Sequence, residues 1–284
     1  MSDAMLGFEQ QLLALFPEQH QRDCYRLFVS QLWQTLSKKR QDPAVIGISG
    51  AQGTGKTTLS SLLVQFAKEQ GVIAGAVSLD DYYLSQQQRG VLAAEIHPLL
   101  AMRGMPGSHN IGQAIADAQA VLQGLPVALP RFDKAQDQPT AALEPQQFSL
   151  LIVEGWCLGL TAQSIVDLEP PINLLEKSED RTLSWRHFVN QQLAGQYQQY
   201  WSLLSSLIWL KAPDWPTICR WRAMQEHQLR QQRGKGMNDA ELERFMQTFQ
   251  RLTEHSFLVL PQRVDLVVEL DPLHQPQLRQ SQFL

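Results

Sequence analysis

The stretch Val45-Ile-Gly-Ile-Ser-Gly-Ala-Gln-Gly-Thr-Gly-Lys-Thr-Thr-Leu-Ser-Ser-Leu-Leu63 decides the fold of this chain. Its middle, from Gly50 to Thr57, fits the pattern G-x-x-x-x-G-K-[S/T] at every fixed position. Glycine lets the backbone curl so that successive N–H groups point inward at a phosphate. The helix that follows adds the positive end of its dipole, and a lysine in this place reaches the β- and γ-phosphates. The pattern therefore predicts a nucleotide phosphate site.

A glycine-rich turn between a strand and a helix can also be purely structural, but here the flanks favour the phosphate site. Ala44–Ile48 is a short apolar run suited to a buried parallel strand, and Thr58–Lys68 has helical apolar spacing. Lys56 is expected to be catalytic because it adds charge to the transition state, and the hydroxyl of Thr57 is placed to coordinate Mg²⁺. The expected nucleotide-binding residues are Gly50, Ala51, Gln52, Gly53, Thr54, Gly55, Lys56, Thr57 and Thr58.

Composition bounds the class of protein. The chain has 284 residues and a net charge of −4, which argues against nucleic acid or an anionic membrane as the main partner. Its three cysteines are widely spaced and odd in number, so they predict neither a disulfide framework nor a metal ligand pair. No apolar run approaches the length of a membrane span. We expect a cytoplasmic protein that is a monomer or a homodimer.

Five short apolar runs are each typical of a buried strand. They cover Ala44–Ile48, Gly71–Ser78, Phe148–Val153, Leu207–Leu210 and Val264–Leu270. Strands that alternate with helical segments predict a parallel sheet with helices on both faces. We therefore predict an α/β fold of the P-loop NTPase type, with a mainly parallel five-stranded sheet.

Helical patterns occupy most of the remaining chain. They are expected at Met5–Phe16, Gln21–Lys38, Ile111–Gln123, Glu179–Tyr200 and after Pro216, whereas Asp80–Asn110 reads as irregular. The first two helices precede the first strand and decorate the core. We find no internal repeat or clear linker, so we expect one domain over residues 1–284, with N-terminal helices in 1–43, the core in 44–270 and a tail in 271–284.

Acidic residues follow two of the predicted strands. Ligands in such sheets lie beyond the carboxyl ends of the strands, and Asp80 and Glu154 stand at two of these ends. A carboxylate at Asp80 could take the proton from a bound alcohol, and Glu154 could hold Mg²⁺ directly or through water. Asp80 and Asp81 could instead be a capping or turn pair, a role that we favour for Asp81.

The phosphate loop, Ser78–Tyr83, Pro130–Lys134 and Val153–Trp156 resemble, in this order and spacing, the phosphoribulokinase, uridine kinase and pantothenate kinase group. Three further segments resemble the narrower D-glycerate 3-kinase branch of that group. They are Arg103–Asn110, Leu207–Pro213 and Gly234–Met237. The resemblance extends over roughly Val45 to Leu270.

The resemblance implies an ATP-dependent, Mg²⁺-using kinase of a small molecule, with D-glycerate as the acceptor that fits best. It implies that Asp80 is the catalytic aspartate, that Glu154 is the acidic residue linked to Mg²⁺, and that an arginine-rich lid lies around Arg220–Gly236. Relatives in this branch often carry a glycine-rich, arginine-bearing segment after an aspartate–lysine pair. Here that segment reads Asp133-Lys-Ala-Gln-Asp-Gln-Pro-Thr140.

A hydroxy acid needs a cationic fork for its carboxylate, and Arg103 and Arg131 are the candidates because guanidinium binds carboxylate in a bidentate way. Asp80, Tyr83 and His109 complete the expected acceptor site. Arg103 could instead form a loop salt bridge, and a lone loop histidine is often only solvated.

Two other functions stay open. The chain could phosphorylate another metabolite, such as a nucleoside, pantothenate or a sugar phosphate, or it could be a nucleotide-driven switch or assembly ATPase. A GTPase switch would need an Asn-Lys-x-Asp guanine reader, and the sequence contains no Asn-Lys dipeptide. An assembly ATPase would not need the proton acceptor Asp80.

Overall fold

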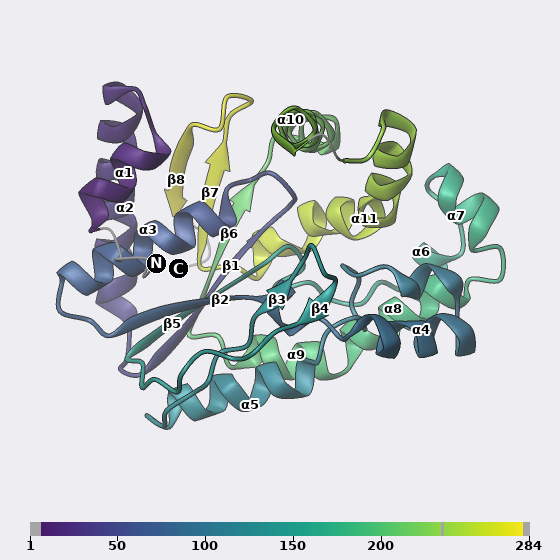
Figure 1. The fold of residues 1–284 in the computed structure, drawn as a ribbon, viewed down its shortest axis with the longest axis horizontal. Helices are drawn as coiled ribbons and strands as arrows, with labels where there is room; N and C mark the ends of the chain where they lie inside the picture. The colour runs from purple at the N-terminus through teal and green to yellow at the C-terminus, as the bar shows by residue number, and fades with distance from the viewer. Residues whose placement is uncertain (1–6, 234–235, 281–284) are drawn as a thin grey trace.

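A computed structural model of the chain describes residues 7–233 and 236–280. Its centre is a six-stranded sheet with the strand order β2-β5-β1-β6-β7-β8 (Figure 1). The strands are β1 (Ala44–Gly50), β2 (Ala74–Ser78), β5 (Leu150–Gly155), β6 (Ser206–Lys211), β7 (Leu266–Leu270) and β8 (Pro276–Gln280).

The first five strands pair in parallel, as the apolar runs predict. All residues of β1 and β5 are buried, because helices cover both faces of the sheet. The predicted count of five strands is wrong by one. Residues 276–280, expected in a tail beyond the core, pair antiparallel with β7 and form the edge of the sheet.

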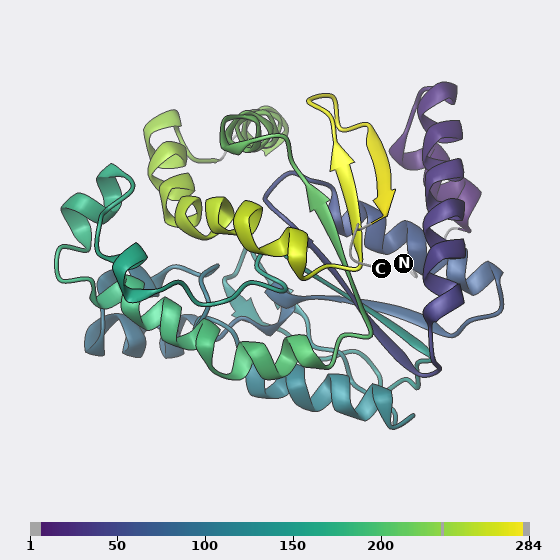
Figure 2. The ribbon, with the colours of Figure 1, turned by 180° about the vertical axis from the view of Figure 1, so that it is seen from behind.

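Helices lie on both sides of the sheet (Figures 1 and 2). Two hydrophobic cores flank the sheet, one on each face. One core lies under α1 (Phe8–Leu15), α2 (Gln19–Lys39) and α3 (Lys56–Glu69). The other lies under α5 (Ile111–Leu122) and α9 (Gln196–Ser202). None of the helices within the described ranges is both long and apolar enough to cross a membrane.

The helical segments differ from the sequence prediction, notably before Asn110 and in the region from Glu179 to Tyr200. The stretch expected to be irregular contains α4 (Gln86–Glu95), which begins after Ser85 in a capping box with Gln88. The long helical region expected at about Glu179–Tyr200 consists of shorter helices, because Leu183 adopts a left-handed φ of 65° and Gly195 separates α8 from α9. The pieces before α9 are α7 (Leu174–Glu179) and α8 (Ser184–Ala194).

The remaining elements surround the carboxyl ends of the parallel strands (Figure 1). They are the short hairpin of β3 (Phe132–Asp133) and β4 (Gln138–Pro139), α6 (Ile165–Leu168), α10 (Trp215–Arg233) and α11 (Asp239–Val259). Three 3₁₀ turns complete the described chain, at Leu79–Tyr82, Pro98–Ala101 and Leu260–Gln262.

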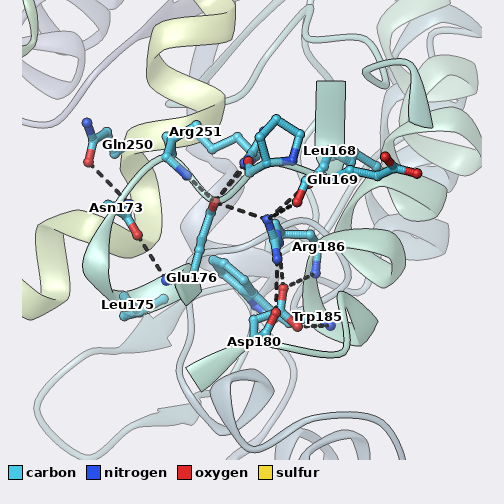
Figure 3. Close-up of polar contacts among 12 residues, drawn as sticks. Leu168, Glu169, Asn173, Leu175, Glu176, Asp180, Trp185, Arg186, Gln250 and Arg251 are labelled. Carbon is cyan, nitrogen blue, oxygen red and sulfur yellow. Dashed lines mark hydrogen bonds and ion pairs between the residues drawn. The ribbon is translucent and has the colours of Figure 1, made fainter. Parts of the chain in front are cut away.

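A buried ionic network joins α7, α8 and α11 (Figure 3). The carboxylate of Glu176 accepts two hydrogen bonds of 2.7 Å from Arg251 and one of 3.4 Å from Arg186. Arg186 also donates to Asp180 at 2.8 Å and to the carbonyl of Leu168 at 2.9 Å. The four charged side chains are buried, so this network depends on every partner being present. It ties α11 to the helices beside it.

Candidate active site

The predicted phosphate loop connects β1 to α3 and is built on glycine. Gly53 and Gly55 have φ values of 81° and 83°, in the left-handed region that favours glycine. A Cβ atom at Gly53 would also lie 3.0 Å from the Cβ of Trp221. Inside the loop, the hydroxyl of Thr54 donates to the carbonyl of Ala51 at 2.8 Å, and the ammonium of Lys56 donates to the same carbonyl at 3.0 Å. The loop therefore forms a closed turn at the start of a helix, which is a geometry that binds phosphate.

Lys56, Thr57 and Glu154 meet beside this loop. Burial lowers the pKa of Lys56, although the carboxylates of Glu154 and Asp80 act in the opposite direction. The hydroxyl of Thr57 donates to Oε1 of Glu154 at 2.9 Å. Glu154 lies beside the phosphate loop because β5 is between β1 and β2 in the sheet. Glu154 of β5 is aligned with Ile48 of β1, near the end of the strand that leads into the loop.

A hydroxyl and a carboxylate are the oxygen ligands that Mg²⁺ prefers, and Mg²⁺ in such sites usually keeps waters and binds substrate phosphates as well. Among the described residues, no group of three or more His, Cys, Asp or Glu side chains could hold a metal ion alone. Thr57 and Glu154 therefore fit a Mg²⁺ ion that is held jointly with phosphate.

Asp80 lies opposite the loop and is engaged by two donors. The ammonium of Lys134 donates to Oδ2 of Asp80 at 2.6 Å, and the hydroxyl of Tyr83 donates to Oδ1 at 2.7 Å. Burial raises the pKa of Asp80, but the charge of Lys134 and the two hydrogen bonds lower it by more, so the pKa lies below its ordinary value. Asp80 is thus kept as a carboxylate, the form that can accept a proton.

The neighbouring Asp81 has the capping role that the sequence favours. Its carboxylate accepts from the backbone N–H of Ser78 at 3.1 Å and from that of Phe132 at 3.3 Å. It also pairs with Arg131 at 3.1 Å. Asp81 therefore fixes the turn after β2 and the start of the β3–β4 hairpin.

His109 is buried behind Tyr83. The two rings stack with centroids 4.7 Å apart, and Nδ1 of His109 lies 2.7 Å from the hydroxyl of Tyr197. Burial lowers the pKa of His109 to about 4, so the ring is neutral at pH 7. His109 was predicted to lie in the site of the phosphoryl acceptor. In the structure it has a supporting role, because its ring packs against Tyr83, the residue that donates a hydrogen bond to Asp80.

One cavity of about 760 Å³ lies between the phosphate loop and α10 and α11, within the size range of small-molecule sites. Phe245 and Phe249 of α11 form part of its wall. Its charged lining residues are Lys56, Asp80, Arg89, Arg103, Lys134, Asp137, Glu154 and Arg222. The cavity therefore contains the predicted catalytic residues together with five cationic side chains.

The predicted lid overlaps α10 and the connection to α11. Arg222 of α10 lines the cavity and pairs with Glu226 at 2.6 Å. Gly234 and Lys235 lie outside the described residues. The part of the arginine-rich segment that lies on α10 is therefore beside the phosphate loop.

The two arginines expected to bind a carboxylate have different places. Arg103 lines the cavity, and its guanidinium donates to Oδ1 of Asp137 at 2.6 Å. Arg131 instead lines a neighbouring cavity of about 370 Å³, which shares Thr57 and Glu154 with the first. The structure does not bring these two arginines together as a fork.

Sequence reasoning missed three charged residues of the cavity. Arg89 lies on α4, a helix that was not expected, and it is 1% exposed. Lys134 and Asp137 belong to the β3–β4 turn. Lys134 ends the segment Pro130–Lys134 that resembles the relatives, and Asp137 lies in the stretch after it that differs from their pattern. Neither signal indicated which residues the turn would contact.

The proteins to which this chain is similar include kinases. No protein-family model matches the sequence. The chain is 29% identical over 242 residues to the uncharacterized kinase mug58 of Schizosaccharomyces pombe, across 78% of this chain and 84% of that protein. It is 27% identical over 224 residues to the chloroplastic D-glycerate 3-kinase of Arabidopsis thaliana, across 73% of this chain and 46% of that protein. The chain is thus similar in sequence to proteins that are named as kinases.

The fold of a D-glycerate 3-kinase from Cryptococcus neoformans is similar to the fold of this chain, with a TM-score of 0.69 at 22% identity over 89% of this chain and 96% of the other. The predicted resemblance to the phosphoribulokinase, uridine kinase and pantothenate kinase group is confirmed, and so is the α/β fold with a mainly parallel sheet. The kinases among the similar proteins support the prediction that this chain is a phosphotransferase.

Proposed function

We propose that the protein is an ATP-dependent kinase that transfers the γ-phosphoryl group to a hydroxyl of a small hydroxy acid, with D-glycerate as the best candidate. The observation that carries the proposal is that one cavity is lined by Lys56 of the phosphate loop, by the carboxylate of Asp80 and by Arg103. Phosphoryl transfer needs positioning, charge neutralisation and an acceptor for the hydroxyl proton, and these residues supply each of them. The D-glycerate 3-kinases among the relatives support the choice of acceptor.

Each residue has one role in this proposal. The ammonium of Lys56 exchanges the carbonyl of Ala51 for phosphate oxygens and stabilises the charge of the transition state. Asp80 accepts the proton of the attacking hydroxyl. Thr57 and Glu154 would hold Mg²⁺, which supplies neutralisation of the phosphate charge when it is bound. The backbone N–H groups of the loop orient the phosphates.

The proposal also includes the location, the domain organisation and the oligomeric state of the protein. We place the protein in the cytoplasm, with residues 1–284 as one kinase domain that acts as a monomer or homodimer. A charged acceptor is favoured over an uncharged nucleoside because the cavity wall carries arginines.

The experiment compares D-glycerate with glycerol at matched concentrations, with ADP release as the readout and a reaction without acceptor as the control. Both compounds contain a CHOH–CH2OH unit, and D-glycerate has a carboxylate where glycerol has another CH2OH group. We expect ADP release that depends on D-glycerate and little with glycerol. If glycerol is phosphorylated equally well, or if a nucleoside or a sugar phosphate is the better acceptor, the hydroxy acid assignment is wrong. If pantothenate, which also has hydroxyl groups and a carboxylate, is the better acceptor, the choice of D-glycerate is wrong. ADP release without any acceptor would indicate an ATPase.

A further inference from the structure

Arg89 is a fully buried arginine whose guanidinium reaches the wall of the active-site cavity. It donates to the carbonyl of Leu84 at 2.6 Å and to that of Ala101 at 3.1 Å. The remaining arm donates to the carboxylate of Asp137. Two neutral carbonyls fix the position of the guanidinium but do not neutralise it, so a cation this well buried needs an anion beside it.

Asp137 supplies that anion to two arginines at once. One carboxylate oxygen accepts from Arg89, and the other accepts from Arg103 at 2.6 Å. The guanidinium of Arg103 also lies 5.8 Å from the ring centroid of Phe132, which helps to set its orientation. Two guanidinium groups that share one carboxylate leave one positive charge over. Such a pair is therefore suited to a second carboxylate or to an exchange of one carboxylate for another.

The turn that carries Asp137 also reaches the proposed catalytic base. Residues 134–137 connect the two-residue strands β3 and β4, and Lys134 at the start of the turn donates to Asp80 at 2.6 Å. Asp137 at its end has a φ of 56°, in the left-handed region. Both residues line the cavity. One short turn thus engages the base and the arginine pair from the same side.

We propose that Arg89 and Arg103 form the subsite for the acid group of the acceptor, and that Asp137 is an internal carboxylate that the acid group of the acceptor displaces. This inference rests on the proposed function. It names Arg89, and not Arg131, as the partner of Arg103. Because Lys134 lies on the same turn, displacement of Asp137 also loosens the ion pair on Asp80 and couples recognition of the acid to release of the base.

The test is a calorimetric titration of D-glycerate into the full-length protein, with glycerol as the uncharged probe. Asp137→Asn keeps the size of the side chain, and asparagine tolerates the left-handed conformation that position 137 requires. Loss of the internal competitor should tighten D-glycerate binding by about tenfold, the effect of one charge-assisted contact. Arg103→Gln should weaken it by at least about tenfold for the same reason.

Two control variants each remove a charge of the same type, a carboxylate or an arginine, from a place outside the proposed subsite. Glu144→Gln removes an exposed carboxylate, and Arg244→Gln removes an arginine that pairs with Glu179 at the surface. Neither should change D-glycerate binding. Arg89 is too buried for its variants to carry the test alone, so the conclusion rests on Arg103 and Asp137, with a thermal melt of each variant to confirm folding.

The outcomes separate the subsite from the function. Binding that is unchanged or weaker in Asp137→Asn, binding of glycerol as tight as that of D-glycerate, or no D-glycerate binding in wild type and Asp137→Asn alike would overturn the subsite. Phosphorylation of D-glycerate is then measured separately with ATP. If binding responds as expected but no phosphoryl group is transferred, the subsite stands and the proposed function fails.

Discussion

Tyr83 donates a hydrogen bond of 2.7 Å to the carboxylate of Asp80, and Tyr83→Phe removes this donor with little change in shape. A hydrogen bond to a charged group contributes about 1.5–3 kcal/mol, and one pKa unit corresponds to about 1.4 kcal/mol. The donor stabilises the ionised carboxylate, so its loss should raise the pKa of Asp80. The ion pair with Lys134 remains, so we expect an effect at the lower end of the range of about 1.5–3 kcal/mol.

The assay is the pH dependence of kcat/KM for the acceptor, whose acidic limb reports the ionisation of Asp80 in the free enzyme. Because only the carboxylate can accept a proton, a raised pKa moves the acidic limb to higher pH. The matched control is Tyr82→Phe. Tyr82 is the adjacent buried tyrosine, and its hydroxyl donates to Asp117 at 2.9 Å. An acidic limb that does not move in Tyr83→Phe, or that moves equally in Tyr82→Phe, would refute the role given to Asp80.

Three further outcomes are expected. Lys56→Ala should abolish most turnover without changing the thermal melting temperature, because the glycine backbone shapes the loop and the lysine contributes charge to the transition state. Normal turnover would show that the loop is not the phosphate site. Asp80→Asn should lower turnover by about 10²–10⁴-fold with ATP binding retained, and Asp81→Asn should lower it less; equal losses would contradict the distinct roles of the pair. Glu176→Gln should lower the free energy of unfolding, measured in urea, by about 3 kcal/mol or more, because it breaks a buried ion pair. Glu179→Gln, at a surface ion pair, should lower it by less than about 1 kcal/mol. Similar losses would show that burial of the network contributes nothing.

The parallel strands could be predicted because each is a short apolar run, which is what burial on both faces requires. The edge strand β8 could not, since its sequence Pro276-Gln-Leu-Arg-Gln280 has no apolar run and pairs through its backbone. Helix α4 was hidden by the glycines and prolines of the stretch around it. Its capping box from Ser85 to Gln88 was the local signal that could have identified it.

The part of the site that depends on strand ends was accessible from the sequence. Asp80 and Glu154 follow apolar runs, and the rule that ligands lie at the carboxyl ends of strands places both near the phosphate loop. The contact of Arg89 and Arg103 with Asp137 follows no such rule. It depends on the conformation of a four-residue turn and on a helix that reaches that turn from a distant part of the sequence.

The central place of β1 has a consequence for folding during synthesis. Its neighbours in the sheet are β5 and β6, and within the described part of the chain β2 pairs only with β5. Both early strands therefore have none of these partners until much later segments leave the ribosome. Contacts between residues far apart in sequence form slowly, and unpaired apolar strands are prone to aggregation. The nascent chain therefore exposes its phosphate-loop strand until β5 has left the ribosome, and a ribosome-bound fragment that ends before β6 cannot yet pair that strand on both sides.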